Sequence, residues 1–432
     1  MSLLLERRAK PPQDRAALFA DYYDVIYDRE VQKKNYLATV LAERRADVDA
    51  IHHATGLRLQ VASENAGEAE ALLSSHDFES IIRDRLTEEG HEGAALDRLS
   101  GDLLQAARDR LVLVAANGKD QVGFELRSIQ EFMAARALVD GLDHQVIERL
   151  RVIAPSAHWR NTWLLAVGAV HRDRPRLFDP VLHMMRELDA SDTFSLIIET
   201  APRLAVDILD DGMASKSPKH LRLLIDLALQ LLTSVPYLGA GKLGDVLAEV
   251  GDDETVRLRV IAALQRAWDG PPMEHEAAAI VLERLTGADQ QGALPARARQ
   301  MQNTKPITAP PVGPGVGGTK VRLSEALPAE TRNWPTTSVE GRFVEDLRNF
   351  RTTLGVRGEF VIPGGITPRQ SATDLLADDV ALNRVADAID AIEPYNWSGR
   401  VAIVAFLWRA RERVPVADHL PLSEPTSREL RT

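Results

Sequence analysis

Apolar residues recur at helical spacing over the first part of the chain. In residues 11–54 they lie three or four positions apart, which predicts an N-terminal helical segment over residues 1–54. The positions that carry the pattern are Leu18, Tyr22, Ile26, Leu37, Leu41 and Val48. Residues 56–64 (GLRLQVASE) are compatible with a short strand or with the start of a loop. Two further helices are expected in AEALLSSHDFESIIRDRLTEEG and LDRLSGDLLQAARDRL.

The pattern then changes to two short apolar runs around a turn. In residues 111–126 (LVLVAANGKDQVGFEL) the runs flank Asn117-Gly118, the strongest short signal for a β-hairpin. A helix is expected to begin at Ser128 directly after the second run. Several helices, a hairpin and another helix predict a winged-helix-like domain over residues 55–141.

Short amphipathic helices dominate the next part of the chain. Residues 142–290 predict an irregular α-solenoid, a helical-repeat array of the HEAT-like kind, in segments separated by prolines. Residues 291–320 are rich in Pro, Gly and Thr, which predicts a flexible linker. Residues 321–432 predict a small, mainly helical C-terminal domain with a short strand in GEFVIPGG. GRVAIVAFLWRARERV is long enough to favour a helix over a strand. The predicted fold class is therefore mostly α.

Composition narrows the function classes. The chain has 432 residues, enough for about three domains at roughly 150 residues each. Its formal net charge is −11, which argues against nonspecific nucleic-acid binding through Lys and Arg. It contains no cysteine, so disulfides, thiolate catalysis and cysteine zinc sites are excluded. The sequence shows no signal peptide and no apolar run of about 18 residues, so we expect no membrane association and a cytoplasmic protein.

Two glycine-rich stretches invite a phosphate-loop interpretation that their residues do not support. In GPGVGGTK (313–320) the Thr-Lys order is reversed and no apolar strand precedes it. In GAGKLGD (239–245) Leu243 stands where a magnesium-binding Ser or Thr is required. HEAAA (275–279) lacks the second histidine of a zinc-protease helix. We therefore predict no catalytic residue, no metal site and no cofactor in this chain.

Trp159 and Trp163 in WRNTW are four residues apart, so they are expected to share one helix face. Packing in the core is the favoured interpretation. The alternative is a surface anchor for a protein partner, because exposed Trp is a frequent hot spot of interfaces.

Residues 122–141 (VGFELRSIQEFMAARALVDG) pass from a strand into a helix with almost nothing between. Ser128 and Glu131 have the spacing of a capping box, in which each side chain satisfies a backbone N–H of the first turn. The residues after the cap are apolar nearly all round, which is typical of a buried helix. The polar residues are therefore expected to start a helix rather than to catalyse a reaction.

The same stretch resembles the Phe-x-His-x-Ser-Phe-Gln-Glu-Phe-x-Ala-Ala segment of NACHT-type STAND ATPases, near the end of their winged-helix region. The resemblance covers roughly residues 11–190. The matching residues are Phe124, Ser128, Gln130, Glu131, Phe132, Ala134 and Ala135. Leu126 stands where many members have His, and Ile129 where many have Phe. The family's phosphate loop and acidic strand lie upstream of this region and have no counterpart in this chain.

The resemblance implies that this chain is the non-catalytic regulatory and sensor portion of a STAND signalling ATPase. The process it implies is antiviral defence in a bacterium. Its partners would be an NTPase domain, on the same or a separate polypeptide, and a trigger ligand or protein on the helical array. ATPase activity would require that NTPase domain. Three alternatives stay open. They are a winged-helix DNA-binding regulator, a helical-repeat scaffold for protein interactions, and an enzyme in residues 321–432 using Gly364-Gly365. The DNA alternative requires a basic recognition helix, but Arg108 and Arg110 are accompanied by Asp102 and Asp109.

Overall fold

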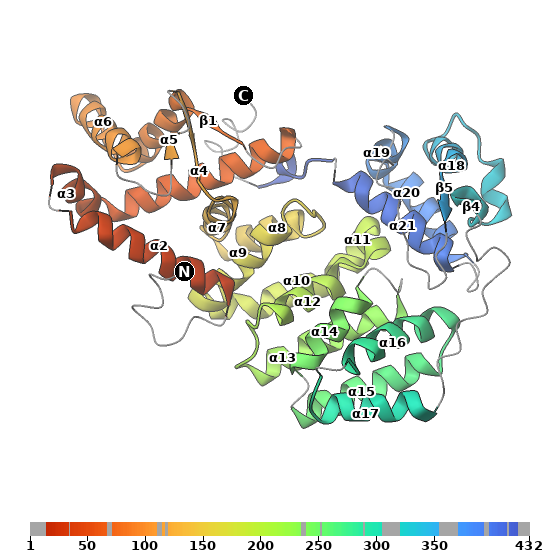
Figure 1. The fold of residues 1–432 in the computed structure, drawn as a ribbon. Coiled ribbons are helices and arrows are strands. Elements are labelled where there is room, and N and C mark those ends of the chain that lie inside the picture. The colour runs from red at the N-terminus through yellow and green to blue at the C-terminus, as the bar shows by residue number, and fades with distance from the viewer. Residues whose placement is uncertain are drawn as a thin grey trace. The chain divides into compact units, whose positions relative to one another are not determined.

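A computed structural model confirms the mostly helical fold (Figure 1). It divides into two compact units: unit 1 contains residues 1–182 and 415–432, and unit 2 contains residues 183–414. The helix α10 (Pro175–Ser191) crosses the boundary. The residues that the structure describes are 14–33, 35–66, 71–109, 115–116, 120–234, 239–250, 253–287, 290–304, 320–353, 370–392, 397–412 and 414–421.

Three helices open unit 1, as the hydrophobic pattern predicts. They are α2 (Arg15–Val31), α3 (Tyr36–Glu43) and α4 (Arg45–Ala66). Side chains cap the first two, since the Asp14 carboxylate accepts from Ala17 N at 2.7 Å and the Asn35 side-chain oxygen accepts from Ala38 N at 2.9 Å.

The expectation of a strand or loop at residues 56–64 is wrong, because α4 continues to Ala66. Leu57, Leu59 and Val61 alternate with polar residues as they would in a strand. All three are nevertheless buried, at 4 %, 0 % and 4 % exposure. This part of α4 is covered on several sides, so apolar residues occur on more than one face of the helix. Their spacing in the sequence therefore does not show the helical period.

A small sheet follows within unit 1. Its elements are β1 (Leu73–Ser74), α5 (Ser75–Glu88), α6 (Gly93–Asp109), β2 (Ala115–Ala116) and β3 (Gln121–Gly123). The strand order is β1-β3-β2, with both pairings antiparallel. Val122 lies opposite Leu73 on one side and Ala116 on the other. The two strands of the predicted hairpin are thus paired, while its turn, residues 117–119, lies outside the described residues.

The helix after the hairpin is α7 (Arg127–Leu138), and the predicted capping box at its start is wrong. Leu126 is the N-cap residue, and no side chain caps this end. The helix begins two residues earlier than the spacing of Ser128 and Glu131 requires, so Ser128 already lies in its first turn. Two further helices complete this part of unit 1. They are α8 (Asp143–Ile153) and α9 (Arg160–Asp173).

Unit 2 begins with short helices that pack on one another in succession, as expected for an array. They are α11 (Thr193–Ile198), α12 (Thr200–Asp210), α13 (Pro218–Ala228), η1 (Leu229–Thr233), α14 (Ala240–Val250), α15 (Glu254–Trp268), α16 (Pro272–Leu285) and α17 (Ala293–Thr304). The GAGKLGD stretch, which does not support a phosphate loop, lies at the start of α14. Its Lys242 binds Asp207 at 2.7 Å and Asp210 at 2.9 Å, as an ordinary ion-paired residue.

Helix α17 occupies the first part of the predicted linker, so the boundary at residue 291 is too early. Leu294, Ala298 and Met301 are buried and lie on one face, at a spacing of three or four. This face packs on α15 and α16. Residues 305–319, the rest of the linker apart from Lys320, lie outside the described residues, and so does most of GPGVGGTK.

The last part of unit 2 is the predicted small domain. Its elements are β4 (Lys320–Arg322), η3 (Leu323–Glu325), η4 (Ala329–Asn333), α18 (Val339–Asn349), β5 (Arg351–Thr353), α19 (Gln370–Leu376), α20 (Asp379–Asp390) and α21 (Trp397–Arg411). Strands β4 and β5 pair antiparallel. The helix predicted in GRVAIVAFLWRARERV is confirmed, since this stretch forms most of α21. GEFVIPGG and Gly364-Gly365 lie outside the described residues.

This small domain shares its hydrophobic core with the array. Phe343, Val385 and Leu407 are completely buried at its centre. Phe194 and Ile198, from α11 of the array, belong to the same core. Residues 183–290 and the C-terminal helices therefore pack as one unit, although the sequence pattern separates them.

Unit 1 also includes a segment from the far end of the chain. Val416 is 1 % exposed and Leu420 is 7 % exposed, around the short 3-10 helix η6 (Ala417–His419). Both carboxylate oxygens of Glu64 accept from this segment, one from Val416 N and the other from Ala417 N, each at 3.1 Å. Arg149 Nε donates to Pro421 O at 3.2 Å. None of the described helices of either unit is long and apolar enough to cross a membrane.

Candidate functional site: a polar junction on helix α7

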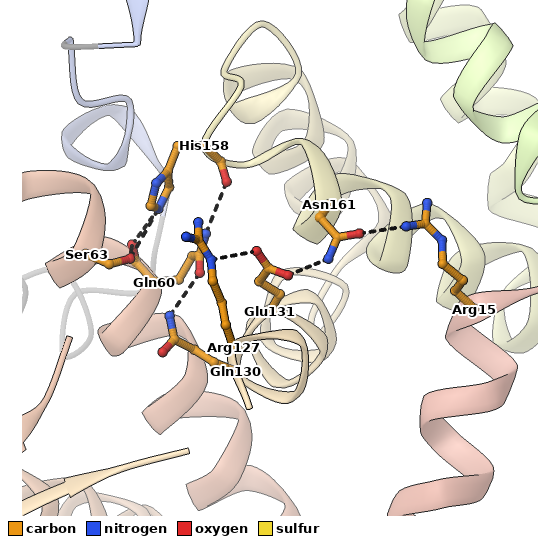
Figure 2. A network of polar contacts seen from close by, with 8 residues as sticks. All are labelled: Arg15, Gln60, Ser63, Arg127, Gln130, Glu131, His158 and Asn161. Atoms are coloured by element: carbon orange, nitrogen blue, oxygen red, sulfur yellow. Dashed lines mark hydrogen bonds and ion pairs between the residues drawn. The ribbon is translucent and has the colours of Figure 1, made fainter. Parts of the chain in front are cut away.

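The motif residues singled out in the sequence lie together at the start of α7. Phe124 follows β3, and Gln130, Glu131, Phe132, Ala134 and Ala135 are buried on α7. Ser128 is only partly buried in the first turn. Buried polar groups need hydrogen-bond partners, so the partners of Gln130 and Glu131 reveal what the motif does. We call these two side chains and their partners the polar junction (Figure 2).

Gln130 connects α7 to α4 and to the turn before α9. Its Nε2 donates to Gln60 Oε1 on α4 at 3.1 Å, and Gln60 Nε2 donates onward to His158 O at 3.3 Å (Figure 2). Gln60 is completely buried and Gln130 is 5 % exposed. The paired amides thus join three chain segments through a path that water hardly reaches.

His158 closes this side of the junction. Its Nε2 lies 3.1 Å from Gln60 O and 3.3 Å from Ser63 Oγ. A backbone carbonyl only accepts, so Nε2 carries the ring proton. Burial lowers the pKa of His158 below the ordinary value of 6.5. The ring is therefore neutral at pH 7 and serves as a hydrogen-bonding group.

Glu131 makes the second set of connections. Its Oε1 accepts from Arg127 Nε at 3.1 Å within α7, and its Oε2 accepts from Asn161 Nδ2 on α9 (Figure 2). The Asn161 side-chain oxygen in turn accepts from Arg15 Nη1 on α2 at 3.0 Å. Glu131 is 7 % exposed, so the carboxylate is ion-paired and hydrogen-bonded where it is buried. This chain of contacts ties α2, α7 and α9 together.

Small residues allow α4 and α7 to approach closely beside the junction. A Cβ added at Gly56 would lie 2.5 Å from Met133 Cβ, 2.8 Å from Ala134 N and 2.9 Å from Gln130 O. Two of these atoms belong to the α7 backbone, which cannot turn away as a side chain can. The absence of a side chain at Gly56 therefore allows α4 to pack directly on the backbone of α7. On the other side of α7, the Phe132 ring packs on Phe19 of α2 with centroids 5.9 Å apart.

Trp159 and Trp163 are both 0 % exposed, so the packing interpretation holds and the partner-anchor alternative does not fit. They flank the junction on the α9 side, with Trp159 as the N-cap residue of α9. Trp163 Nε1 donates to Leu150 O of α8 at 3.0 Å. Neither indole is available to a partner at the surface of unit 1.

The chemistry of the junction is that of a structural connection. Glu131 has both oxygens bonded, and no hydroxyl or thiol nucleophile lies against it among its described partners. Within the described ranges, no group of three or more His, Asp or Glu residues is arranged to hold a metal ion.

Sequence reasoning finds the α7 half of the junction and misses the other half. The missing residues are Arg15, Gly56, Gln60, Ser63, His158 and Asn161. Gly56 carried a usable signal, since a glycine inside a helical pattern often marks close packing. The polar partners lie on other elements and have no local pattern that would identify them.

Comparison of the chain with family models, with curated proteins and with solved structures gave no match in any of the three.

Changing Asn161 to Asp is expected to destabilise the junction. The substitution replaces the N–H donor facing Glu131 Oε2 with a second carboxylate, so a hydrogen bond is lost and two like charges meet. We expect a loss of about 1–3 kcal/mol in unit 1 at pH 7, measured as faster amide hydrogen exchange in α7 and α9. The matched control is Asn383→Asp on α20, an exposed position whose side-chain oxygen accepts from Thr193 Oγ1 and would still accept after the change. Equal effects at both positions would contradict this role.

Proposed function

We propose that this chain is a non-catalytic regulatory and sensing part of a STAND-type signalling ATPase, as its resemblance to the NACHT-type family implies. The observation that carries the proposal is the polar junction. The Gln-Glu pair of the motif bonds to Arg127 within α7, to α4 through Gln60, and to α9 and α2 through Asn161. A residue pair that ties together the helices lying just before the array in the sequence suits a relay of conformational change.

The order of elements in unit 1 gives further support. A winged-helix domain has a strand after its first helix, two more helices and then a hairpin whose second strand pairs with the first strand. The order α4, β1, α5, α6, β2, β3, with sheet order β1-β3-β2, corresponds to that arrangement. We therefore interpret residues 45–123 as a winged-helix-like domain, with α7 as its exit into the array.

The mechanism we propose is a shift between two conformations. A trigger that binds one arrangement of the helical array better than the other biases the equilibrium by its difference in affinity. Gln130, Glu131 and their partners on α2, α4 and α9 would transmit that bias to the ATPase domain, which binds the nucleotide.

The charge on α6 disfavours DNA binding by this domain. In a winged helix the last helix before the hairpin enters the DNA groove, and phosphate contacts need Lys or Arg there. The exposed charged residues on the described face of α6 are Asp97 and Arg98, and Asp97 is ion-paired with Arg83 of α5 at 2.9 Å. Arg108, Asp109 and Arg110 have side chains outside the described residues. A gel shift with a salt titration would test the alternative, because binding through phosphates weakens steeply with salt.

The decisive experiment separates this chain from an ATPase partner. The purified chain alone is expected to hydrolyse no ATP above background. Co-expression with the coding region adjacent to its own gene is expected to recover a complex with an ATPase domain. Asn161→Asp should weaken that complex or alter its ATP turnover, whereas Asn383→Asp should do neither. ATP hydrolysis by the isolated chain at rates well above background would overturn the proposal.

A further inference from the structure

Unit 2 contains a pocket unrelated to the polar junction, with a volume of about 220 Å³. It is lined by residues of α10, α11, α12, η1, α20 and α21. Its floor and walls are formed by Leu196, Ile197, Pro202, Ala386 and Ile389, and its polar lining by Asp189, Glu199, Gln230, Thr233, Asp390 and Arg400. Taking about 30 Å³ for one water molecule, the space would hold about seven waters or one small organic molecule.

Glu199 is the most unusual residue of this pocket. It lies between α11 and α12 with φ 56° and ψ 60°, and it is the one non-glycine residue with positive φ in the described part of the chain. A glutamate in this left-handed conformation costs free energy, and such residues gather at functional sites. Burial raises the pKa of Glu199 to about 7, although a hydrogen bond from Ser234 acts in the opposite direction.

Asp189 faces the same pocket from α10. Its Oδ1 accepts from Ala201 N at 3.2 Å, so it caps the start of α12. The backbone N–H of Thr200 is a second donor to Asp189, and because a carboxylate has about four acceptor positions, about two are left for another donor. Burial raises the pKa of Asp189 to about 6. Both carboxylates are therefore held in surroundings that disfavour their negative charge.

The charges around the two carboxylates leave an excess of acid in the lining. Arg400 of α21 donates to Asp390 of α20 at 2.8 Å, so this arginine is already paired within the pocket wall. Arg203 of α12 acts on both Glu199 and Asp189, and it keeps its positive charge where its guanidinium stacks on the Trp408 ring, 4.1 Å from the centroid. Three acids line the pocket against Arg400 in the lining and Arg203 beside it, so the acids still outnumber the two arginines by one.

We propose that this pocket binds a small organic cation, a primary ammonium or guanidinium group on a short apolar stem. The cationic group would lie between Glu199 and Asp189. There it would donate the hydrogen bonds that the two buried carboxylates would otherwise receive from water. The stem would contact Leu196, Ile197 and Ile389. Two carboxylates in the lining of one pocket suffice for such a cation, whereas no group of three or more acidic or histidine ligands for a metal ion occurs here among the described residues.

The pocket predicts a pH dependence of binding with a definite sign. A bound cation favours the ionised carboxylates, so it lowers the pKa of both and protons leave as it binds. Below pH 6 the cation must displace protons from Glu199 and Asp189, while above pH 7 both are already ionised. Affinity is therefore expected to rise roughly tenfold or more from pH 6 to pH 8.

The test uses the full chain and isothermal titration calorimetry at constant ionic strength. The probes are butylamine and butylguanidine as cations, each with one charged group on an apolar stem, and butyrate as an anion of similar size. We expect both cations to bind, butyrate not to bind, and Glu199→Gln to weaken cation binding at least tenfold and to flatten its pH profile. The matched control is Glu283→Gln on the exposed side of α16, which should bind like the unchanged chain.

Three results would overturn the proposal. The first is no detectable cation binding at 10 mM probe. The second is binding of butyrate as tight as that of the cations, and the third is an unchanged cation affinity in Glu199→Gln. The pH profile of the unchanged chain decides the matter if Glu199→Gln does not fold, because a flat profile contradicts the role of the two carboxylates. The proposal does not depend on the proposed function, since it is tested by binding alone and without an ATPase partner.

Discussion

Replacing Trp163 with alanine is expected to destabilise unit 1 by about 3–5 kcal/mol, the range for removing a large buried aromatic side chain. Trp163 is 0 % exposed and packs where α8 meets α9. The cavity left behind would lie where α9 meets α8, so the packing of these two helices should loosen as well. Because the chain has two units, we expect the loss as a lower first melting transition and as faster hydrogen exchange in α7 to α9, with unit 2 unaffected.

Conservative changes at the two tryptophans separate packing from hydrogen bonding. Trp163→Phe removes the donor to Leu150 O, whereas the Trp159 Nε1 is buried without a hydrogen-bond partner among the described residues. Trp163→Phe should therefore cost about 1 kcal/mol more than Trp159→Phe. If Trp159→Ala and Trp163→Ala both left the first melting transition unchanged, the packing of α9 described here would be wrong.

Gly56→Ala is expected to destabilise unit 1 by about 1–3 kcal/mol, the usual cost of forcing an extra methyl group into a packed interface. The added Cβ would lie 2.8 Å from Ala134 N and 2.9 Å from Gln130 O, so α4 and α7 would have to separate. Separation would strain the hydrogen bond between Gln130 and Gln60. The measurement is the melting temperature of unit 1 together with the exchange rate of the α7 amides.

The matched control is the same glycine-to-alanine change at another helical position, where we expect the opposite effect on stability. Gly101 lies inside α6, is exposed, and has no atom within 4 Å of a Cβ added to it. Gly101→Ala should therefore stabilise its helix by about 0.5–1 kcal/mol, because alanine loses less conformational entropy than glycine in a helix. A stabilising effect at both positions would show that Gly56 does not set the distance between α4 and α7.

Local patterns predict the helices, the paired strands β2 and β3 and the burial of α7, because each depends on residues close in sequence. The start of α7 was predicted less well. Ser128 and Glu131 have capping spacing, but Glu131 instead binds Arg127 and Asn161. Asn161 comes from α9, thirty positions later, so no local rule reveals its competition for the carboxylate. The capping signal was overridden by a tertiary contact.

The same limit explains the linker and the pocket. Residues 291–320 are mostly polar, so the helical spacing of Leu294, Ala298 and Met301 is easily missed in the sequence. These three residues form a helix face that is stabilised by packing on α15 and α16. Glu199 and Arg400 are about two hundred positions apart in the sequence and meet only because α11 shares a core with the C-terminal helices. Sites assembled from such distant segments are not visible in spacing or composition.

The contact between Glu64 and residues 416–417 makes unit 2 an insertion, since the chain leaves unit 1 after residue 182 and returns to it at residue 415. Expression fragments should be designed accordingly. A protein cut after residue 414 would lose the amides that Glu64 accepts and would expose the surface that Val416 covers. Excising residues 183–414 and bridging the gap with a glycine-serine loop should better preserve unit 1 for crystallisation or NMR.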